Sequence, residues 1–157
     1  HNNQNAANEL LWNHESSTEA YDMYDSLTFE EGAATTVPTG SSLVCLSCHD
    51  GTVALDNFGG TTGGTHYVTA GNNVGSDLTD DHPISFTFDV TDEELAATDT
   101  PVTFTNGSGT IATMLEGGTT VQCSSCHDVH NTVSAGGVKL LVKANTASAL
   151  CLTCHTK

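Results

Sequence analysis

Cys45-Leu-Ser-Cys48-His49 decides the fold of this chain, because its pattern returns in Cys123-Ser-Ser-Cys126-His127 and in Cys151-Leu-Thr-Cys154-His155. These three copies of Cys-x-x-Cys-His contain all six cysteines of the 157 residues. Two thiols separated by two residues can add to the two vinyl groups of one haem, and the histidine that follows lies beside the iron as its proximal ligand. The pattern therefore predicts three covalently bound haem c groups, attached by Cys45, Cys48, Cys123, Cys126, Cys151 and Cys154, with His49, His127 and His155 as proximal ligands.

Two other uses of paired cysteines fit the pattern less well. A zinc site built from two Cys-x-x-Cys pairs needs no histidine after each pair and would leave the third pair without a role. A disulfide framework is open to six cysteines in an oxidising compartment, but Cys-x-x-Cys pairs are too close for most structural bridges. With eight histidines in the chain, a histidine follows all three pairs by chance about once in ten thousand cases.

The charge of the chain is strongly acidic. Nineteen acidic residues stand against three lysines and no arginine, which gives a formal net charge of −16. Such a surface repels nucleic acid and anionic membranes. No apolar run is long enough to span a bilayer, and the first five residues form neither a signal peptide nor a transit peptide. Because haem is normally attached outside the cytoplasm, we expect an extracellular or periplasmic protein whose signal peptide has already been removed.

The spacing of the motifs predicts one trihaem domain over residues 1–157. Its expected parts are an N-terminal arm over 1–44, a first haem site at 45–49, a β-rich insert over 50–122, and the second and third haem sites within 123–157. Large apolar residues are few, so the haems are expected to form much of the core. The predicted fold is mostly irregular coil wrapped around haems, with short helices at the Cys-x-x-Cys-His sites and a few short β-strands.

Local patterns predict the elements between the motifs. Alternating apolar residues over 84–90 indicate a half-buried strand. Residues 102–111 surround an Asn-Gly-Ser-Gly turn and indicate a small β-hairpin. A short helix is expected over 92–97 and a strand over 138–142. Loops are predicted for the glycine-rich stretches 32–42 and 59–64.

Five histidines lie outside the motifs and are candidates for the distal side of each iron: His1, His14, His66, His82 and His130. The chain has only two methionines, which disfavours a set of mostly methionine-ligated haems. Ligation by two histidines is the economical interpretation, and it favours lower reduction potentials than a histidine–methionine pair. We expect His14, His82 and His130 to be the distal ligands.

His130 is the most informative of the three, because it follows His127 by three residues. If this segment is helical, the two rings share a face and cannot bind one iron from opposite sides. His130 must then reach a different haem, which brings two haems close together.

The other candidates differ in their surroundings. His82 lies between two aspartates and a proline, and a carboxylate could fix the tautomer of its ring. His14 is close to Trp12, the only tryptophan, which suits packing against a haem. His66 lies in a glycine-rich stretch, where an ordinary loop histidine is the favoured interpretation.

The chain resembles multihaem cytochromes c with doubled Cys-x-x-Cys-His motifs, which are exported electron carriers of metal-respiring and related bacteria. The resemblance rests on the runs WNH (12–14), CLSCHDGTVA (45–54), DHP (81–83), CSSCHDVHN (123–131) and ALCLTCHTK (149–157). It implies that His14, His82 and His130 occupy distal-ligand positions. In that family a further motif, Cys-x-x-Cys-His-Thr-Pro-His, often precedes WNH. A shortened relative and a missing upstream haem segment therefore both stay open, and His1 becomes a fourth distal candidate.

The expected function is electron transfer through closely spaced bis-histidine haems. Enough histidines are present to give every iron a distal ligand, which argues against an enzyme whose iron has an open coordination position. Some relatives of this class polymerise into extracellular filaments, and the long arm and insert suit contacts with neighbouring subunits. We expect self-association into a filament or another multi-subunit conduit, with other redox proteins or extracellular electron acceptors as partners. A soluble periplasmic shuttle is the alternative, and a distal ligand from a neighbouring subunit stays open.

Overall fold

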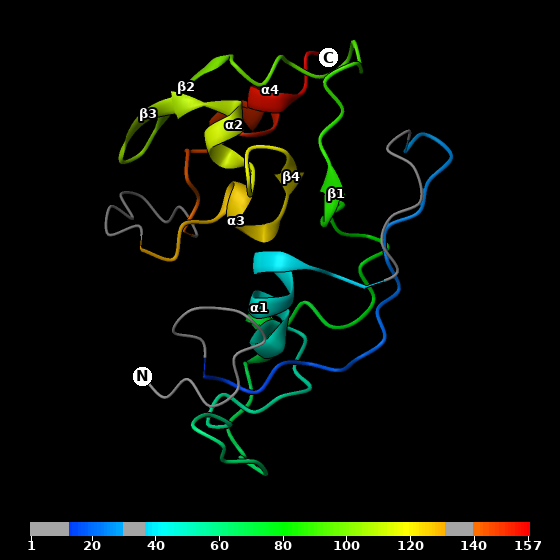
Figure 1. The fold of residues 1–157 in the computed structure, drawn as a ribbon, viewed down its shortest axis with the longest axis vertical. Coiled ribbons are helices and arrows are strands. Elements are labelled where there is room, and N and C mark those ends of the chain that lie inside the picture. The colour runs from blue at the N-terminus through cyan, green and yellow to red at the C-terminus, as the bar shows by residue number, and fades with distance from the viewer. Residues whose placement is uncertain (1–12, 30–36, 131–139) are drawn as a thin grey trace. The chain divides into compact units, whose positions relative to one another are not determined.

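Irregular coil with short helices makes up most of this protein (Figure 1). The computed structural model describes residues 13–29, 37–130 and 140–157. The strands within these ranges form two separate two-stranded sheets. The predicted fold class, mostly coil with short helices at the motifs and a few short strands, is therefore confirmed.

The chain divides into two compact units. The first comprises residues 1–27 and 34–83, and the second comprises residues 28–33 and 84–157. The first unit contains the first Cys-x-x-Cys-His motif, and the second unit contains the other two. A single trihaem domain over residues 1–157 stays a prediction.

The first motif lies at the end of α1, Gly40–His49. This helix follows Thr39, whose extended backbone (φ −126°, ψ 176°) is that of an N-cap residue. The predicted loop over 32–42 is wrong for its last three residues, which are helical; residues 32–36 lie outside the described ranges. Glycine and serine favour helices weakly, but Ser42, Leu46 and Ser47 are all buried in α1. Tertiary packing therefore outweighs local propensity here.

Short backbone bridges hold the coil of the first unit together. His14 pairs antiparallel with Phe58, and Asp22 pairs in parallel with Asp77. The 3-10 turn η1, Ala70–Asn72, lies between these partners in the sequence. The segment 13–22 is thus attached near both of its ends to loops that follow the first motif.

The predicted hairpin is present in the second unit. It consists of β2, Pro101–Phe104, and β3, Gly107–Thr110, with Val102 opposite Gly109. The helix α2, Ile111–Met114, follows β3 directly. The Asn-Gly pair at the turn made this element visible in the sequence.

A second sheet pairs β1, Phe86–Thr87, with β4, Thr120–Val121. The strand predicted over 84–90 is thus reduced to two residues, and Val90 at its end is 67 % exposed. Phe86 meets the edge of the Phe29 ring at a centroid distance of 5.2 Å. The alternating pattern predicted the buried side chain of Phe88, but it failed at Val90 and overestimated the length of the pairing.

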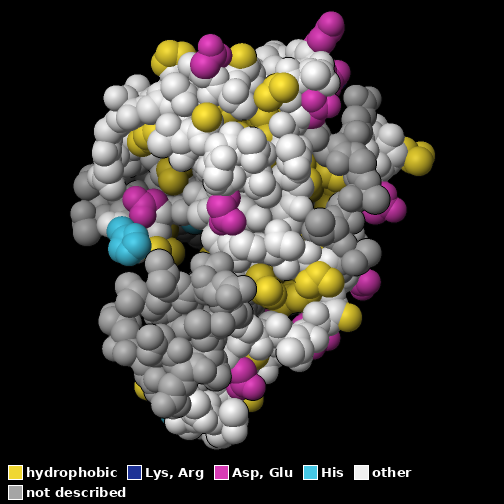
Figure 2. Space-filling view, in the orientation of Figure 1, with side chains coloured by type: hydrophobic (Ala, Val, Ile, Leu, Met, Phe, Trp, Pro, Cys, Tyr) yellow, Lys and Arg dark blue, Asp and Glu magenta, His cyan; other side chains and the backbone are white. Residues whose placement is uncertain are grey.

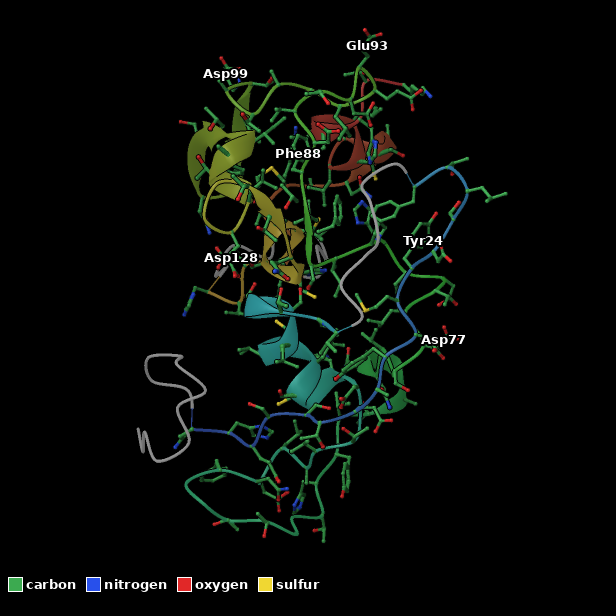
Figure 3. The ribbon with its side chains drawn as sticks, turned by 45° about the vertical axis from the view of Figure 1, so that its right-hand side comes forward. Tyr24, Asp77, Phe88, Glu93, Asp99 and Asp128 are labelled. Carbon is green, nitrogen blue, oxygen red and sulfur yellow. The ribbon has the colours of Figure 1, made fainter. Side chains whose placement is uncertain are left out.

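The core of the second unit lies beside its two motif helices, α3, Cys123–Cys126, and α4, Cys151–Cys154. Cys126 and Cys154 pack against this core. Figure 3 shows Phe88 inside the unit, with Glu93 and Asp99 at its outer edge. The buried members of the core are Phe88, Val102, Ile111, Met114, Leu115, Val121 and Leu150.

Two expected elements differ from the structure. The helix predicted over 92–97 is wrong, because these residues form turns and Leu95 makes an antiparallel bridge with His155. Of the strand predicted over 138–142, residues 138 and 139 lie outside the described ranges. Residues 140–142 form only an isolated bridge, at Leu141, whose partner is His127. A further 3-10 turn, η2, Thr146–Ser148, precedes α4.

None of the helices in the described ranges is long and apolar enough to cross a membrane. Acidic side chains are scattered over the face of the protein shown in Figure 2.

Candidate haem-binding sites

The first site is built on the last turn of α1. None of the six cysteines forms a disulfide, and Cys45 and Cys48 are half-buried here. The Nδ1 atom of His49 lies 2.7 Å from the carbonyl oxygen of Asn72. When Nδ1–H donates to this carbonyl, the ring lone pair is on Nε2, which is the tautomer that an iron ligand needs. The backbone N–H of Val74 also donates to the His49 carbonyl at 2.7 Å, so the 72–74 turn holds the residue at two points.

His14 lies at this first site, although 34 residues separate it from Cys48. Its side chain is buried. The Nε2 atom lies 2.9 Å from the Ala54 carbonyl oxygen and 3.7 Å from the Sγ of Cys48. The bridge from His14 to Phe58 fixes the backbone at this position. The structure therefore brings His14 to the first motif, while its role as a distal ligand stays a prediction.

A buried polar network directly follows the first motif and was missed from the sequence. Its centre is Asp50, which is only 5 % exposed and directly follows His49. The Tyr21 hydroxyl donates to Asp50 Oδ2 at 2.6 Å, and Thr52 donates to Oδ1 through its N–H at 2.8 Å and its hydroxyl at 2.9 Å. The only sequence signal was the aspartate that follows both His49 and His127.

The same network joins the arm to α1. The backbone N–H of Ser17 donates to Ser47 Oγ at 3.1 Å, and the Ser17 hydroxyl lies 3.2 Å from that of Thr52. Burial and then the hydrogen bond to Asp50 raise the pKa of Tyr21. Burial alone would raise the pKa of Asp50, but hydrogen bonds from Ser17, Tyr21 and Thr52 outweigh it and hold this pKa below its usual value. Asp50 is therefore a charged carboxylate that is buried in the protein and held by hydrogen bonds from its neighbours.

The second and third sites share one local design. Each has a four-residue helix, α3 or α4, followed by its histidine in extended conformation (φ −116° and −89°). Each histidine then forms an antiparallel bridge with a leucine, His127 with Leu141 and His155 with Leu95. Two flanking backbone hydrogen bonds secure each bridge. At the His127 bridge, Val142 N donates to Cys126 O and Asp128 N donates to Leu140 O. At the His155 bridge, Ala96 N donates to Cys154 O and Thr156 N donates to Glu94 O.

These two sites also adjoin each other. Burial, and then the neighbouring thiols of Cys154, Cys123 and Cys151, raise the pKa of Cys126 to about 11. Burial likewise raises the pKa of Cys154, while Lys143 opposes that change. Cys126 and Cys154, the second cysteines of the two attachment helices, therefore pack against the same hydrophobic core.

The other candidate histidines make local contacts. His82 is exposed, and its Nδ1 lies 2.8 Å from the Pro83 carbonyl oxygen. The side chain of His130 is 93 % exposed, with Nδ1 3.8 Å from Asp128 Oδ1. The premise of a helix that continues to His130 is wrong, because α3 ends at Cys126. The roles of His82 and His130 as distal ligands stay predictions.

His66 is an exposed loop residue, as its glycine-rich surroundings suggested. Its Nδ1 lies 3.1 Å from Asp56 Oδ2, and its backbone N–H donates to Asp56 Oδ1 at 3.1 Å. These two hydrogen bonds lower the pKa of Asp56 to about 2. His1 lies outside the described residues.

The comparison with protein families supports this reading of the second unit. Residues 116–157 match the family described as the doubled CXXCH motif. This match supports a multihaem c-type cytochrome. It begins at the turn before β4 and includes both attachment helices with their histidines. No curated protein matches the chain.

The residues of all three sites fit haem c. Each site supplies two thiols at the required spacing and a histidine directly after them. At the first site the hydrogen bond to the Asn72 carbonyl orients the ring as a ligand. Bound haem c supplies an iron that accepts and releases one electron, and the protein sets its position, ligands and electrostatic surroundings.

Proposed function

We propose that this chain is an exported three-haem electron carrier. His49, His127 and His155 are the proximal ligands, and His14, His82 and His130 are the distal ones. The observation that carries the proposal is the paired arrangement of α3 and α4, whose second cysteines pack against one core. Two haem-attachment sites beside one hydrophobic core favour electron transfer between their haems over separate catalytic roles.

The residues of the first site have roles that suit a carrier. Cys45 and Cys48 tether the group, and His49 is oriented from behind by the 72–74 turn. His14 is buried beside Cys48, where it limits the access of water and external ligands to the distal side. A closed, rigid site reduces the reorganisation that accompanies electron exchange, whereas a catalytic iron needs an open position.

The test is a measurement of haem content and iron coordination on the purified native protein. A pyridine haemochrome assay combined with intact mass should give three haems per chain. Carbon monoxide should leave the spectrum of the reduced protein unchanged, because two histidines close each iron. Fewer than three haems would overturn the trihaem proposal, and a carbon monoxide complex would favour a haem enzyme.

A second candidate function, a subunit of a polymeric extracellular conduit, is favoured by the surface at the third site. Cys151, Leu152 and His155 are all exposed there. A haem held by this helix presents an apolar edge to its surroundings, and such edges are commonly covered by another protein. Head-to-tail contacts that do not close would build a filament.

Electron microscopy of native material tests this second function. Linear polymers with one subunit per repeat are the expected result. Dispersed particles of monomer size at every salt concentration and pH would leave the soluble periplasmic shuttle as the role of the carrier.

A further inference from the structure

Fixed charges of opposite sign lie at the first and third haem sites. At the first site, Asp50 is buried directly after the proximal His49 and accepts hydrogen bonds from Tyr21 and Thr52. A carboxylate held by several donors stays ionised even when it is buried. Asp50 is the C-cap residue of α1, and its backbone N–H donates to the Leu46 carbonyl at 2.9 Å, so its charge lies at the end of the attachment helix.

At the third site the nearby charge is positive. The Nζ of half-buried Lys143 donates to Thr153 Oγ1 at 3.0 Å. Thr153 is buried and lies between the two attachment cysteines of α4. The chain has only three lysines against 19 acidic residues, and the ammonium group of one of them contacts a haem-attachment helix.

Glu15, next to His14, is half-buried and adds a second negative charge at the first site, whereas the other charges near these sites are more exposed or already paired. Glu94, next to the bridge that holds His155, forms an ion pair with Lys157, and both side chains are largely exposed. Asp128 follows the second motif, but its side chain is 38 % exposed. Water and salt screen such groups, whereas buried charges keep most of their field. Asp50 and Lys143 therefore dominate the difference between the first and third sites.

A fixed charge near an iron changes its reduction potential in a known direction. Ferric haem carries one more positive charge than ferrous haem, so a nearby anion stabilises the ferric form and lowers the potential. A nearby cation destabilises the ferric form and raises the potential. Where all irons have the same pair of ligands, the local charge and burial are what distinguish them.

We propose that Asp50 and Lys143 order the reduction potentials of the chain, making the first site the most reducing and the third site the least reducing. This inference rests on the proposed electron-carrier function. The ordering favours the transfer of one electron from a ferrous iron at the first site to a ferric iron at the third. One iron is oxidised, the other is reduced, and no proton or further reactant is required.

Potentiometric titration of the complete haem-loaded protein, followed by optical spectroscopy, tests the role of Asp50. Asp50→Asn removes the charge but keeps an acceptor for Thr52, and should raise the lowest of the three midpoints alone. Tyr21→Phe keeps the charge and removes a donor, and should lower this midpoint. Asp25→Asn, with the same charge change at an exposed residue, should move none. If Asp50 only clamps the arm, Asp50→Asn and Tyr21→Phe will shift the midpoint in the same direction, which overturns the proposal.

Lys143 is tested in the same titration. Lys143→Gln should lower the highest midpoint, and Lys143→Arg should restore it. Lys157→Gln is the matched control, because Lys157 is exposed and paired with Glu94. Unchanged midpoints in Lys143→Gln, or an equal shift in all three, contradict the ordering.

Stepwise reduction of the unaltered protein, observed by NMR, tests the order without any substitution. Ferric haem shifts the signals of nearby protons, and these shifts collapse on reduction. The signals of Thr153 should collapse first and those of Tyr21 last; the reverse order refutes the proposal. Haem content is measured separately on each sample. A protein with three haems but another order disproves the ordering alone, whereas fewer haems disprove the function on which it rests.

Discussion

The Nδ1 atom of His49 lies 2.7 Å from the carbonyl oxygen of Asn72, 23 residues further along the chain. This bond fixes the ring from behind, so that Nε2 carries the lone pair. The carbonyl belongs to the main chain and is held in place by η1 and by the bond from Val74 to the His49 carbonyl. Backbone geometry thus fixes the His49 ring at the first site, whereas His14 is held there by the contacts of its own side chain.

His14→Ala should convert one haem per chain from low spin to high spin. The substitution removes the imidazole beside Cys48 and leaves the His49 side intact. Optical and electron paramagnetic resonance spectra of the ferric protein measure the change. A spectrum identical to that of the unaltered protein would show that His14 only packs at the first site.

His130→Ala should also create a high-spin signal, because His130 is expected to ligate the iron of a haem other than that of its own motif. His66→Ala is the matched control, since both rings are exposed and each lies near an aspartate. The control should remain low spin. If His66→Ala alone gives the high-spin signal, the distal assignment of these two histidines must be exchanged.

The sequence predicted those elements that depend on residues close together in the chain. The motif spacing predicted the three attachment helices, and the Asn-Gly turn predicted the hairpin of β2 and β3. The stretch 92–97 was expected to form a short helix. Leu95 instead forms a backbone bridge with His155, which lies 60 residues further along the chain, and no local pattern reveals such a partner.

The same limit applies to the candidate sites. His14 could be named as a candidate from its neighbours and from the resemblance, but neither indicated that it lies at the first motif. The spacing argument for His130 assumed a longer helix, but α3 ends where His127 turns to pair with Leu141. The Asp50 network escaped prediction because two of its members, Ser17 and Tyr21, come from an arm about 30 residues earlier in the chain.

Ile111→Ala should destabilise the second unit by about 2–5 kcal/mol, because removal of a fully buried side chain loses apolar contacts and leaves a cavity. Ile111 is 0 % exposed and lies in the core on which Cys126 and Cys154 pack. Chemical denaturation measures the change. Val90→Ala, at an exposed position of the same unit, should stay within about 0.5 kcal/mol of the unaltered protein. Equal losses in both variants would contradict the assigned core.

The Asp56–His66 pair should show a distinct acid dependence. The folded protein holds the pKa of Asp56 at about 2, below the value of about 3.9 for an unfolded chain. Its stabilising effect is therefore complete above the unfolded value and is lost as the pH falls through about 2. Carbon-13 NMR of the Asp56 carboxyl group should follow this low midpoint. His66→Ala should return the midpoint toward that of an ordinary aspartate, and an unchanged midpoint would place the cause elsewhere.

Gly51→Ala should disturb the proximal side of the first site. Gly51 directly follows Asp50 and has a φ of +75°, and a Cβ there would collide with the side chain of Asn73. Asn73 lies in the turn that holds His49 through Asn72 and Val74. A displaced turn weakens the bond at His49 Nδ1, which makes the imidazole a poorer donor to iron. We expect the lowest midpoint potential to rise.

Gly63→Ala provides the matched control for this last prediction. Gly63 has nearly the same backbone conformation, with a φ of +79°, but a Cβ there would meet nothing within 4 Å. Both variants incur the cost of a left-handed alanine, roughly 1–2 kcal/mol. Only Gly51→Ala adds the collision with Asn73, so only Gly51→Ala should change a midpoint potential in the redox titration. If both variants lose stability equally and neither changes a potential, the 72–74 turn does not tune the ligand. The His49–Asn72 bond would then serve the folding of the first unit alone.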